Sequence, residues 1–212
     1  MKKILTIATI VLFGLSVKAQ DASQGLKGAW FATSQFGYQQ TKSGDTKGTN
    51  LTVLPIVGTF VTPSIAVGAG LGYINIKSET DAKTAANTNL FVIQPLVRKY
   101  WNVAGSLYFF GQLALPVITG KEKESNLKVN QVGLSVSGGF DYFVTKNFSV
   151  EFSYDLANFT STTLKPENGE KTTVTNFGLA HVANVDSYYN TALGGSAPNL
   201  TTPLSVGFKF VF

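Results

Sequence analysis

The chain has 212 residues, of which 44% are hydrophobic and 14% charged, with 21 glycines and no cysteine. Sparse charges and few helix formers argue against a helical bundle. The lack of cysteine excludes a disulfide scaffold, a thiolate zinc site, a cysteine nucleophile and a lipidated N-terminal cysteine. The net charge of +5 would by itself suggest an anionic partner.

Residues 1–19 read as a secretory signal peptide, so we expect a mature chain of residues 20–212. Lys2 and Lys3 precede a stretch of apolar and small residues at 4–15, and Val17 and Ala19 fit the positions before a cleavage site. This stretch is shorter than the roughly 18–20 residues that cross a bilayer as a helix. Removal of residues 1–19 would leave 14 basic and 12 acidic side chains, so much of the net positive charge lies in the signal peptide. A retained N-terminal anchor is the alternative.

Apolar residues in the mature chain recur at every second position, which is the period of β-strands. The predicted strands are eight, at 28–39, 50–61, 65–76, 89–101, 106–118, 129–142, 147–158 and 202–212. Their connections alternate between long and short, and the last long one, at about 159–201, is by far the longest. Such alternation puts the long loops on one rim and both termini on the other. The pattern predicts an all-β, eight-stranded, antiparallel up-and-down transmembrane β-barrel.

The positions of the charges favour this barrel over a soluble sandwich or a lipocalin-like carrier, whose strands alternate as well. Most charged residues lie in the predicted long connections. Those on the small or polar face of the strands are Arg98, Asp141, Glu151, Asp155 and Lys209. Lys99 is on the apolar face, but it lies near a short turn, where a lysine can snorkel to the interface. We therefore predict that lipid covers the apolar face.

Aromatic residues of the apolar face gather near the strand ends, as expected for two interfacial girdles. The girdle residues that we predict are Trp101, Tyr142 and Phe148 towards the short turns, and Tyr38, Tyr73 and Tyr154 towards the long loops. In a soluble sandwich the same residues would form the core.

Several short motifs add a family resemblance. They are Ala-Gln at 19–20, Gly-Leu-Gly-Tyr at 70–73, Pro-Leu-Val-Arg-Lys-Tyr at 95–100, Phe-Asp-Tyr-Phe at 140–143 and the terminal Phe212. With them the chain resembles the small outer-membrane β-barrel family, and in particular the OmpX- and OmpW-like porin-family proteins of the Bacteroidetes. The resemblance covers most of the mature chain outside 159–201. It implies an outer-membrane location in a Gram-negative cell, with both termini in the periplasm.

The same resemblance implies a role for the last predicted strand. In such barrels a final strand of alternating apolar residues that ends in an aromatic residue is the signal read by the barrel-assembly machinery. The residues that would carry this signal are Leu204, Val206, Phe208, Phe210 and Phe212.

The polar face predicts an ionic cluster inside the barrel. Eight strands enclose a lumen that is filled by side chains or holds one small ligand, which argues against general diffusion. Arg98, Asp141, Glu151 and Lys209 all lie close to short-turn ends, and Asp155 shares their face. We expect Glu151 to pair with Lys209, leaving Arg98 to reach Asp141 or Glu151 across the lumen. A structural plug is the main interpretation, and a proton relay or ion path is the alternative.

Residues for catalysis or metal binding are few. The sole histidine, His181, lies in the 159–201 loop with Ser187 six residues on. Outer-membrane lipid A deacylases use a serine and a histidine on the barrel wall beside the lipid, which a loop histidine does not match. Glu122 and Glu124 alternate with lysines, as in a solvated loop. We predict no enzymatic activity, metal or cofactor, and keep a lipid A-modifying enzyme as an alternative.

We therefore expect a monomeric integral outer-membrane protein with a structural or interaction role. A narrow conduit for small or hydrophobic solutes is the alternative. The expected partners are outer-membrane lipid and lipopolysaccharide, the export and barrel-assembly machineries during biogenesis, and a surface ligand at 159–201. Nucleic acid is not expected, because the long connections hold nine lysines against eight acidic residues.

Overall fold

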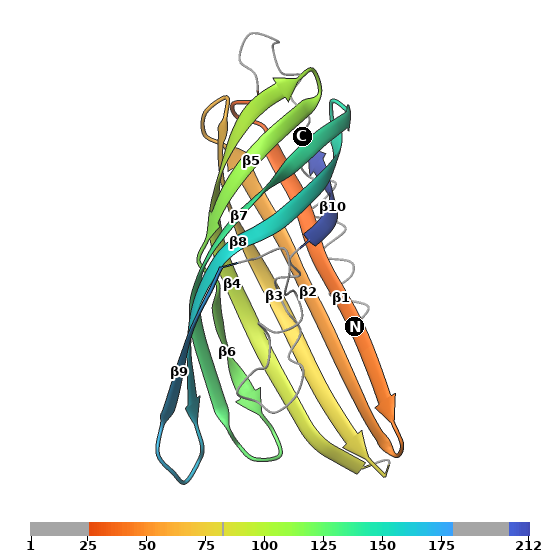
Figure 1. Ribbon diagram of the computed structural model, residues 1–212, viewed down its shortest axis with the longest axis vertical. Helices are drawn as coiled ribbons and strands as arrows, with labels where there is room; N and C mark the ends of the chain where they lie inside the picture. Colours follow the sequence, from red (N-terminus) through yellow and green to blue (C-terminus); the bar gives the residue numbers. More distant parts are fainter. Residues whose placement is uncertain (1–25, 82, 180–203) are drawn as a thin grey trace.

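The strands of the protein form one antiparallel sheet that curls into a barrel (Figure 1). The computed structural model describes residues 26–81, 83–179 and 204–212. Their strand segments are β1 (Trp30–Ser43), β2 (Thr46–Phe60), β3 (Ile65–Thr80), β4 (Lys83–Ala104), β5 (Leu107–Ala114), β6 (Val117–Glu122), β7 (Lys128–Thr145), β8 (Phe148–Lys165), β9 (Thr172–Leu179) and β10 (Leu204–Val211). Within these residues no helix is long and apolar enough to cross a membrane.

Segments β5 and β6 are two parts of one barrel strand. Both pair with β4 on one side and β7 on the other. The break between them falls at Leu115 and Pro116, because proline has no N–H to donate to a neighbouring strand. Pairing nevertheless continues through the break: the Leu115 N–H donates to the Pro95 carbonyl at 3.0 Å, and the Gly133 N–H donates to the Pro116 carbonyl at 2.8 Å.

Segments β9 and β10 together take the place of the eighth strand. β9 pairs with residues 157–164 of β8, whereas β10 pairs with residues 148–154 of β8 and with residues 31–33 of β1. Beyond these pairs, Trp30 and Phe212 exchange backbone hydrogen bonds of 3.0 and 2.8 Å. The barrel is thereby closed at its short-turn end, at the top of Figure 1. The predicted eight-stranded antiparallel barrel is confirmed.

The strands run further towards the long-hairpin rim than predicted. β1 and β2 are joined by a turn at Gly44 and Asp45, with a positive φ of 56° at Gly44, where a connection of about ten residues was expected. The loop boundary at 159 was wrong as well, because residues 159–165 and 172–179 are strand. The apolar alternation ends earlier than the backbone ladder does, since Thr, Asn and Lys continue the strands with polar side chains. Residues 180–201 of the predicted loop lie outside the described residues.

Outward side chains form a continuous apolar exterior. Val57, Leu71, Ile93 and Val132 are between 49 and 63% exposed. Aromatic residues occur in register near both ends of this band. Towards the long hairpins the row is Phe36, Val53, Tyr73 and Phe91, and towards the short turns it is Trp101, Phe109, Phe140 and Phe152. Of the predicted girdle residues, Tyr38, Trp101 and Tyr142 are exposed, and Tyr73, Phe148 and Tyr154 are half-buried.

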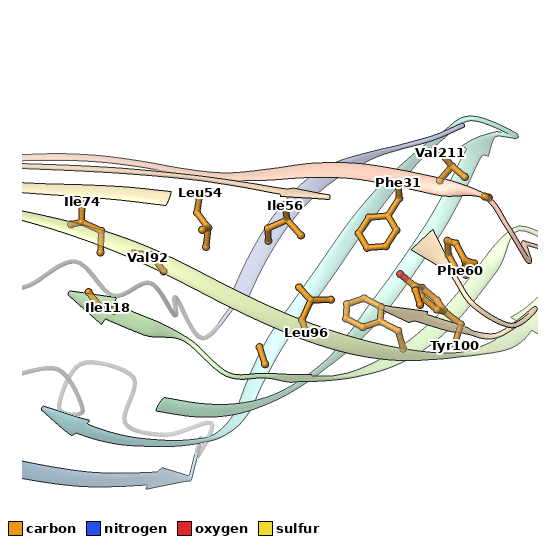
Figure 2. Packing of buried hydrophobic residues seen from close by; sticks show 14 of the residues in the cluster. Phe31, Leu54, Ile56, Phe60, Ile74, Val92, Leu96, Tyr100, Ile118 and Val211 are labelled. Atoms are coloured by element: carbon orange, nitrogen blue, oxygen red, sulfur yellow. The ribbon is translucent and has the colours of Figure 1, made fainter. Parts of the chain in front are cut away.

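The interior is more apolar than expected. The small and polar face that the alternation predicted holds on most of β7 and on residues 66–72 of β3, but β2 and β4 present aliphatic side chains on both faces. In Figure 2, Phe31, Phe60 and Tyr100 lie together near one end, and aliphatic residues extend the apolar lining away from them. Polar side chains are buried among these residues as well: Asn50, Thr52, Thr88 and Gln94. The buried aliphatic residues in this lining include Leu54, Ile56, Ile74, Leu90, Val92, Leu96 and Ile118.

One inward glycine is required by this packing. A Cβ on Gly58 would lie 2.5 Å from the carbonyl oxygen of Val67 and would overlap the ring of Phe31. Gly58 therefore lets β2 approach β3 while the Phe31 ring fills the lumen beside it.

Candidate functional site

Four charged side chains from four strands meet inside the barrel near the short turns. On adjacent strands, Asp141 of β7 lies directly opposite Glu151 of β8. Two carboxylates side by side repel each other, so this register requires cations. Lys209 of β10 and Arg98 of β4 supply them.

Arg98 and Glu151 form a bidentate pair. Arg98 Nη1 donates to Glu151 Oε2 at 2.5 Å, and Nη2 donates to Oε1 at 2.9 Å. The third guanidinium nitrogen, Nε, donates to the side-chain oxygen of Gln112, directly opposite on β5. Because all of these donors lie in one plane, the guanidinium is held in a single orientation.

Lys209 completes the arrangement. Its ammonium forms an ion pair with Asp141 and donates to the Tyr100 hydroxyl at 3.1 Å. The same ammonium lies 4.0 Å from a Glu151 oxygen, so the pairing expected from the sequence is the longer of its two ionic contacts. The Tyr100 hydroxyl also accepts a hydrogen bond of 3.4 Å from Arg98. Tyr100 therefore connects the two ion pairs.

Aromatic rings enclose the charges. The Arg98 guanidinium carbon lies 4.7 Å from the ring centre of Phe110, and the Lys209 ammonium lies 4.9 and 5.3 Å from those of Tyr100 and Phe143. Ring faces attract cations, most strongly where water is excluded. We name the set of Arg98, Tyr100, Phe110, Gln112, Asp141, Phe143, Glu151 and Lys209 the lumenal plug.

The four charged side chains of the plug are buried. Asp141 and Lys209 are 0% exposed, Arg98 4% and Glu151 8%. A buried charge without a partner costs several kcal/mol, but two cations and two carboxylates cancel in formal charge and hydrogen-bond one another. The arrangement lies inside the barrel and links β4, β7, β8 and β10. Among the described residues no group of three or more His, Asp or Glu side chains is placed to hold a metal ion.

The structure does not bring Asp155 into the plug. It is half-buried on β8 opposite Ser137, and no ion pair within the described residues includes it. Conversely, Tyr100 and Gln112 belong to the plug but were not predicted. Tyr100 lies two positions from Arg98 and therefore shares its face, which is the signal that could have identified it. The place of Gln112 depends on the β4–β5 register. His181 and Ser187 lie outside the described residues.

Glu122 caps the β6–β7 turn at the long-hairpin rim. Its carboxylate accepts hydrogen bonds from the backbone N–H groups of Asn87 at 3.0 Å, Glu124 at 2.9 Å and Ser125 at 2.5 Å, and from the Ser125 hydroxyl. Burial acts to raise the pKa of Glu122, but these hydrogen bonds outweigh it and lower the pKa to about 2. The predicted solvated loop therefore begins with a buried, hydrogen-bonded carboxylate.

The last strand presents three apolar residues outward, whereas Val211 faces the core. Val206, Phe208 and Phe210 are 61, 58 and 49% exposed, and Phe148 stacks on Phe208 at a ring distance of 5.7 Å. Leu204 begins β10, and Phe212 follows it at the seam with Trp30. The inward residues of the same strand are Gly207, Lys209 and Val211.

Comparisons with known proteins identify the fold. No protein-family model and no curated protein matches the sequence. Among solved structures, the chain is similar to the outer membrane protein OprG from Pseudomonas aeruginosa, with a TM-score of 0.50 and 13% sequence identity. The match covers 91% of this chain and 99% of OprG. The likeness therefore spans a whole barrel, and the protein is an antiparallel β-barrel with the architecture of OprG.

Proposed function

We propose that this chain is an integral outer-membrane β-barrel protein with a structural or interaction role and a lumen closed by side chains. The observation that carries the proposal is the burial of the lumenal plug. A continuous water path through the barrel would hydrate these charged groups, but Arg98, Asp141, Glu151 and Lys209 are at most 8% exposed. A barrel of eight strands has little room to lead water around them.

The exterior supports a membrane location. A soluble carrier would have to expose the apolar band and both aromatic rows to water, whereas lipid stabilises them. The strands of 14 to 22 residues in β1–β4 exceed the roughly 9–11 residues that cross a bilayer, which leaves polar hairpins above it. We propose that the short-turn end, where Phe212 lies, faces the periplasm, and that the long hairpins face outward.

The proposed partners follow from this placement. The apolar wall would contact outer-membrane lipid and lipopolysaccharide, and β10 would present its outward residues to the barrel-assembly machinery after export. We propose a monomer without catalytic activity. The alternative of a lipid A-modifying enzyme requires His181 to meet a serine beside the wall. To test that alternative, His181 is replaced by alanine and the lipid A of the host is analysed by mass spectrometry. The alternative predicts that the acylation of lipid A differs between the wild type and this variant.

Planar-bilayer conductance tests the closed lumen. Purified wild-type protein is expected to insert without steady aqueous conductance. The double variant Arg98→Ala, Lys209→Ala removes both cations of the plug and is expected either to conduct or to form an unstable barrel. Its gel mobility before and after heating shows whether the barrel is folded and so distinguishes these two results. A stable open conductance from the wild type would overturn the closed lumen.

A second candidate, a conduit for small hydrophobic solutes, is favoured by one observation. Beyond the plug, towards the long hairpins, the lumen is lined by aliphatic residues such as Leu54, Ile74, Val92 and Ile118. Uptake of a small apolar fluorophore into proteoliposomes tests this function. The conduit predicts uptake by the wild type and reduced uptake by Ile74→Asn, and equal uptake by empty liposomes would contradict it.

A further inference from the structure

Three lysines stand in one row on the outer wall near the long-hairpin rim. Lys121 of β6 lies directly opposite Lys128 of β7, and Lys128 lies directly opposite Lys165 of β8. All three are exposed, while the neighbouring Glu122, Val129 and Leu164 turn inward. The three ammonium groups therefore project from one patch of the exterior.

This row has no acidic counterpart in the wall. Like charges directly opposite each other destabilise a sheet. Among the described residues no ion pair includes any of the three lysines, and the nearby Glu122 is occupied by its own turn. On β3, by contrast, Lys77 pairs with Glu79. Glu167, beyond the row at the rim, accepts a hydrogen bond of 2.6 Å from Asn126, so the row has no acidic ion-pair partner among the described residues.

From the lysine row towards the middle of the barrel wall, the outward side chains change from charged to polar to apolar. Two residues nearer the barrel centre lie Thr119 and Asn130, joined by a hydrogen bond of 2.8 Å, and Thr163 opposite Asn130. Two residues further lie Val117 and Val132, which are 42 and 56% exposed. Going outward on β6 and β7, the wall is thus apolar, then hydroxyl and amide, then cationic, whereas β8 has Ser161 opposite Val132 at the apolar level.

These steps match the layers of a lipid leaflet. Four residues of strand span about 13 Å, or about 10 Å along the bilayer normal at a tilt of about 40°. If Val117 and Val132 contact acyl chains, the lysine row lies at the depth of the headgroups. Flexible lysine stems allow the ammonium groups to adjust to a charged group there.

We propose that Lys121, Lys128 and Lys165 bind the phosphate groups of a phosphorylated lipid in the leaflet that surrounds this rim. The inference rests on the proposed membrane location. It deepens that proposal by naming the lipid class and the strands that hold it: the phosphates lie on the lysine row of β6, β7 and β8. Thr119, Asn130 and Thr163 face the polar part of the headgroup, and the acyl chains lie along Val117 and Val132.

Native mass spectrometry of the detergent-solubilised full-length barrel tests the site. The probes are bisphosphorylated lipid A, its dephosphorylated form and inorganic pyrophosphate. The triple variant Lys121→Gln, Lys128→Gln, Lys165→Gln is compared with Lys42→Gln, Lys47→Gln, Lys83→Gln, a matched loss of three lysines from the same rim. Heat-modifiable gel mobility establishes that each variant is a folded barrel.

The wild type is expected to bind bisphosphorylated lipid A, and the row variant to lose at least about tenfold in affinity, because each lysine near an anionic surface contributes independently. The matched variant should change less than about twofold. Equal binding of the row variant and the wild type would overturn the site, as would equal binding of the dephosphorylated lipid or of pyrophosphate alone. Failure of the wild type to stay in membranes would instead overturn the proposed function.

Discussion

Arg98 and Glu151 face each other from β4 and β8, joined by two hydrogen bonds although 53 residues separate them in the sequence. Their strands are not neighbours in the sheet, because β5 and β7 lie between them. The pair therefore connects separate parts of the barrel wall through the lumen. It adds a link that the backbone ladder does not provide.

Substitution of Arg98 with leucine is expected to destabilise the barrel by about 3–5 kcal/mol, since Glu151 then stays buried without its cation. Urea unfolding in detergent micelles, followed by gel mobility, measures the change. The double variant Arg98→Leu, Glu151→Leu leaves the Lys209–Asp141 pair balanced and should recover part of the loss. Unchanged stability of the single variant would contradict the role given to the plug.

Gly58→Ala is expected to cost about 1–3 kcal/mol, because the added methyl group has no room beside Phe31 and the Val67 carbonyl. Gly207→Ala is the matched control, since a Cβ at this other inward glycine meets no atom within 4 Å. The same urea titration compares the two variants. Equal stabilities would argue against close packing of the Phe31 ring.

Acidification should loosen the β6–β7 turn through Glu122. Its pKa in the folded protein is about 2, below the ordinary value of 4.5. The stabilisation is therefore complete above about pH 4.5 and is lost as the pH falls towards 2. Hydrogen-exchange protection of the Ser125 amide, measured between pH 6 and pH 3, is expected to fall in the wild type. In Glu122→Gln the protection should be low throughout, and a similar pH response in that variant would refute the assignment.

A lysine introduced at an outward position in the middle of the wall tests whether this surface faces lipid or water. Leu113 is 40% exposed and lies opposite Val97 and Val136 in the apolar band. Leu113→Lys should cost about 2–4 kcal/mol in a bilayer, whereas a lysine at a water-exposed site changes stability by about 0.5 kcal/mol or less. Reversible unfolding in liposomes measures the difference. The matched control is Thr41→Lys, at an exposed position of β1 near the long-hairpin rim, which should change stability by about 0.5 kcal/mol or less. Equal costs for the two variants would contradict a lipid-facing Leu113.

Sequence periodicity was sufficient for the eight strands and for most outward faces, because side chains alternate between the apolar exterior and the interior along each strand. It was insufficient where both faces are apolar: in β2, Leu54 and Ile56 point inward and Val57 outward. It also missed the irregularity in β8 near Leu156, where the register shifts between Val136 and Ser137 and exchanges the faces.

The candidate sites could also be predicted only in part from the sequence. Charges on one face near strand ends are visible in the sequence, so Arg98, Asp141, Glu151 and Lys209 could be grouped in advance. Which cation pairs with which carboxylate depends on side-chain reach across the lumen, and Lys209 turned to Asp141. The lysine row was hidden because Lys121, Lys128 and Lys165 meet only through strand register, while the loop charges summed to almost zero.

Membrane extraction tests the central claim, that the chain is a lipid-embedded barrel, most directly. The full-length protein would be expressed with its own N-terminus in a Gram-negative host, and its outer-membrane fraction washed with alkaline carbonate and with urea. The protein is expected to stay in the pellet through both washes. Detergent should then release it as a band that migrates differently before and after heating, as folded barrels do. Release into the wash without detergent would contradict the account.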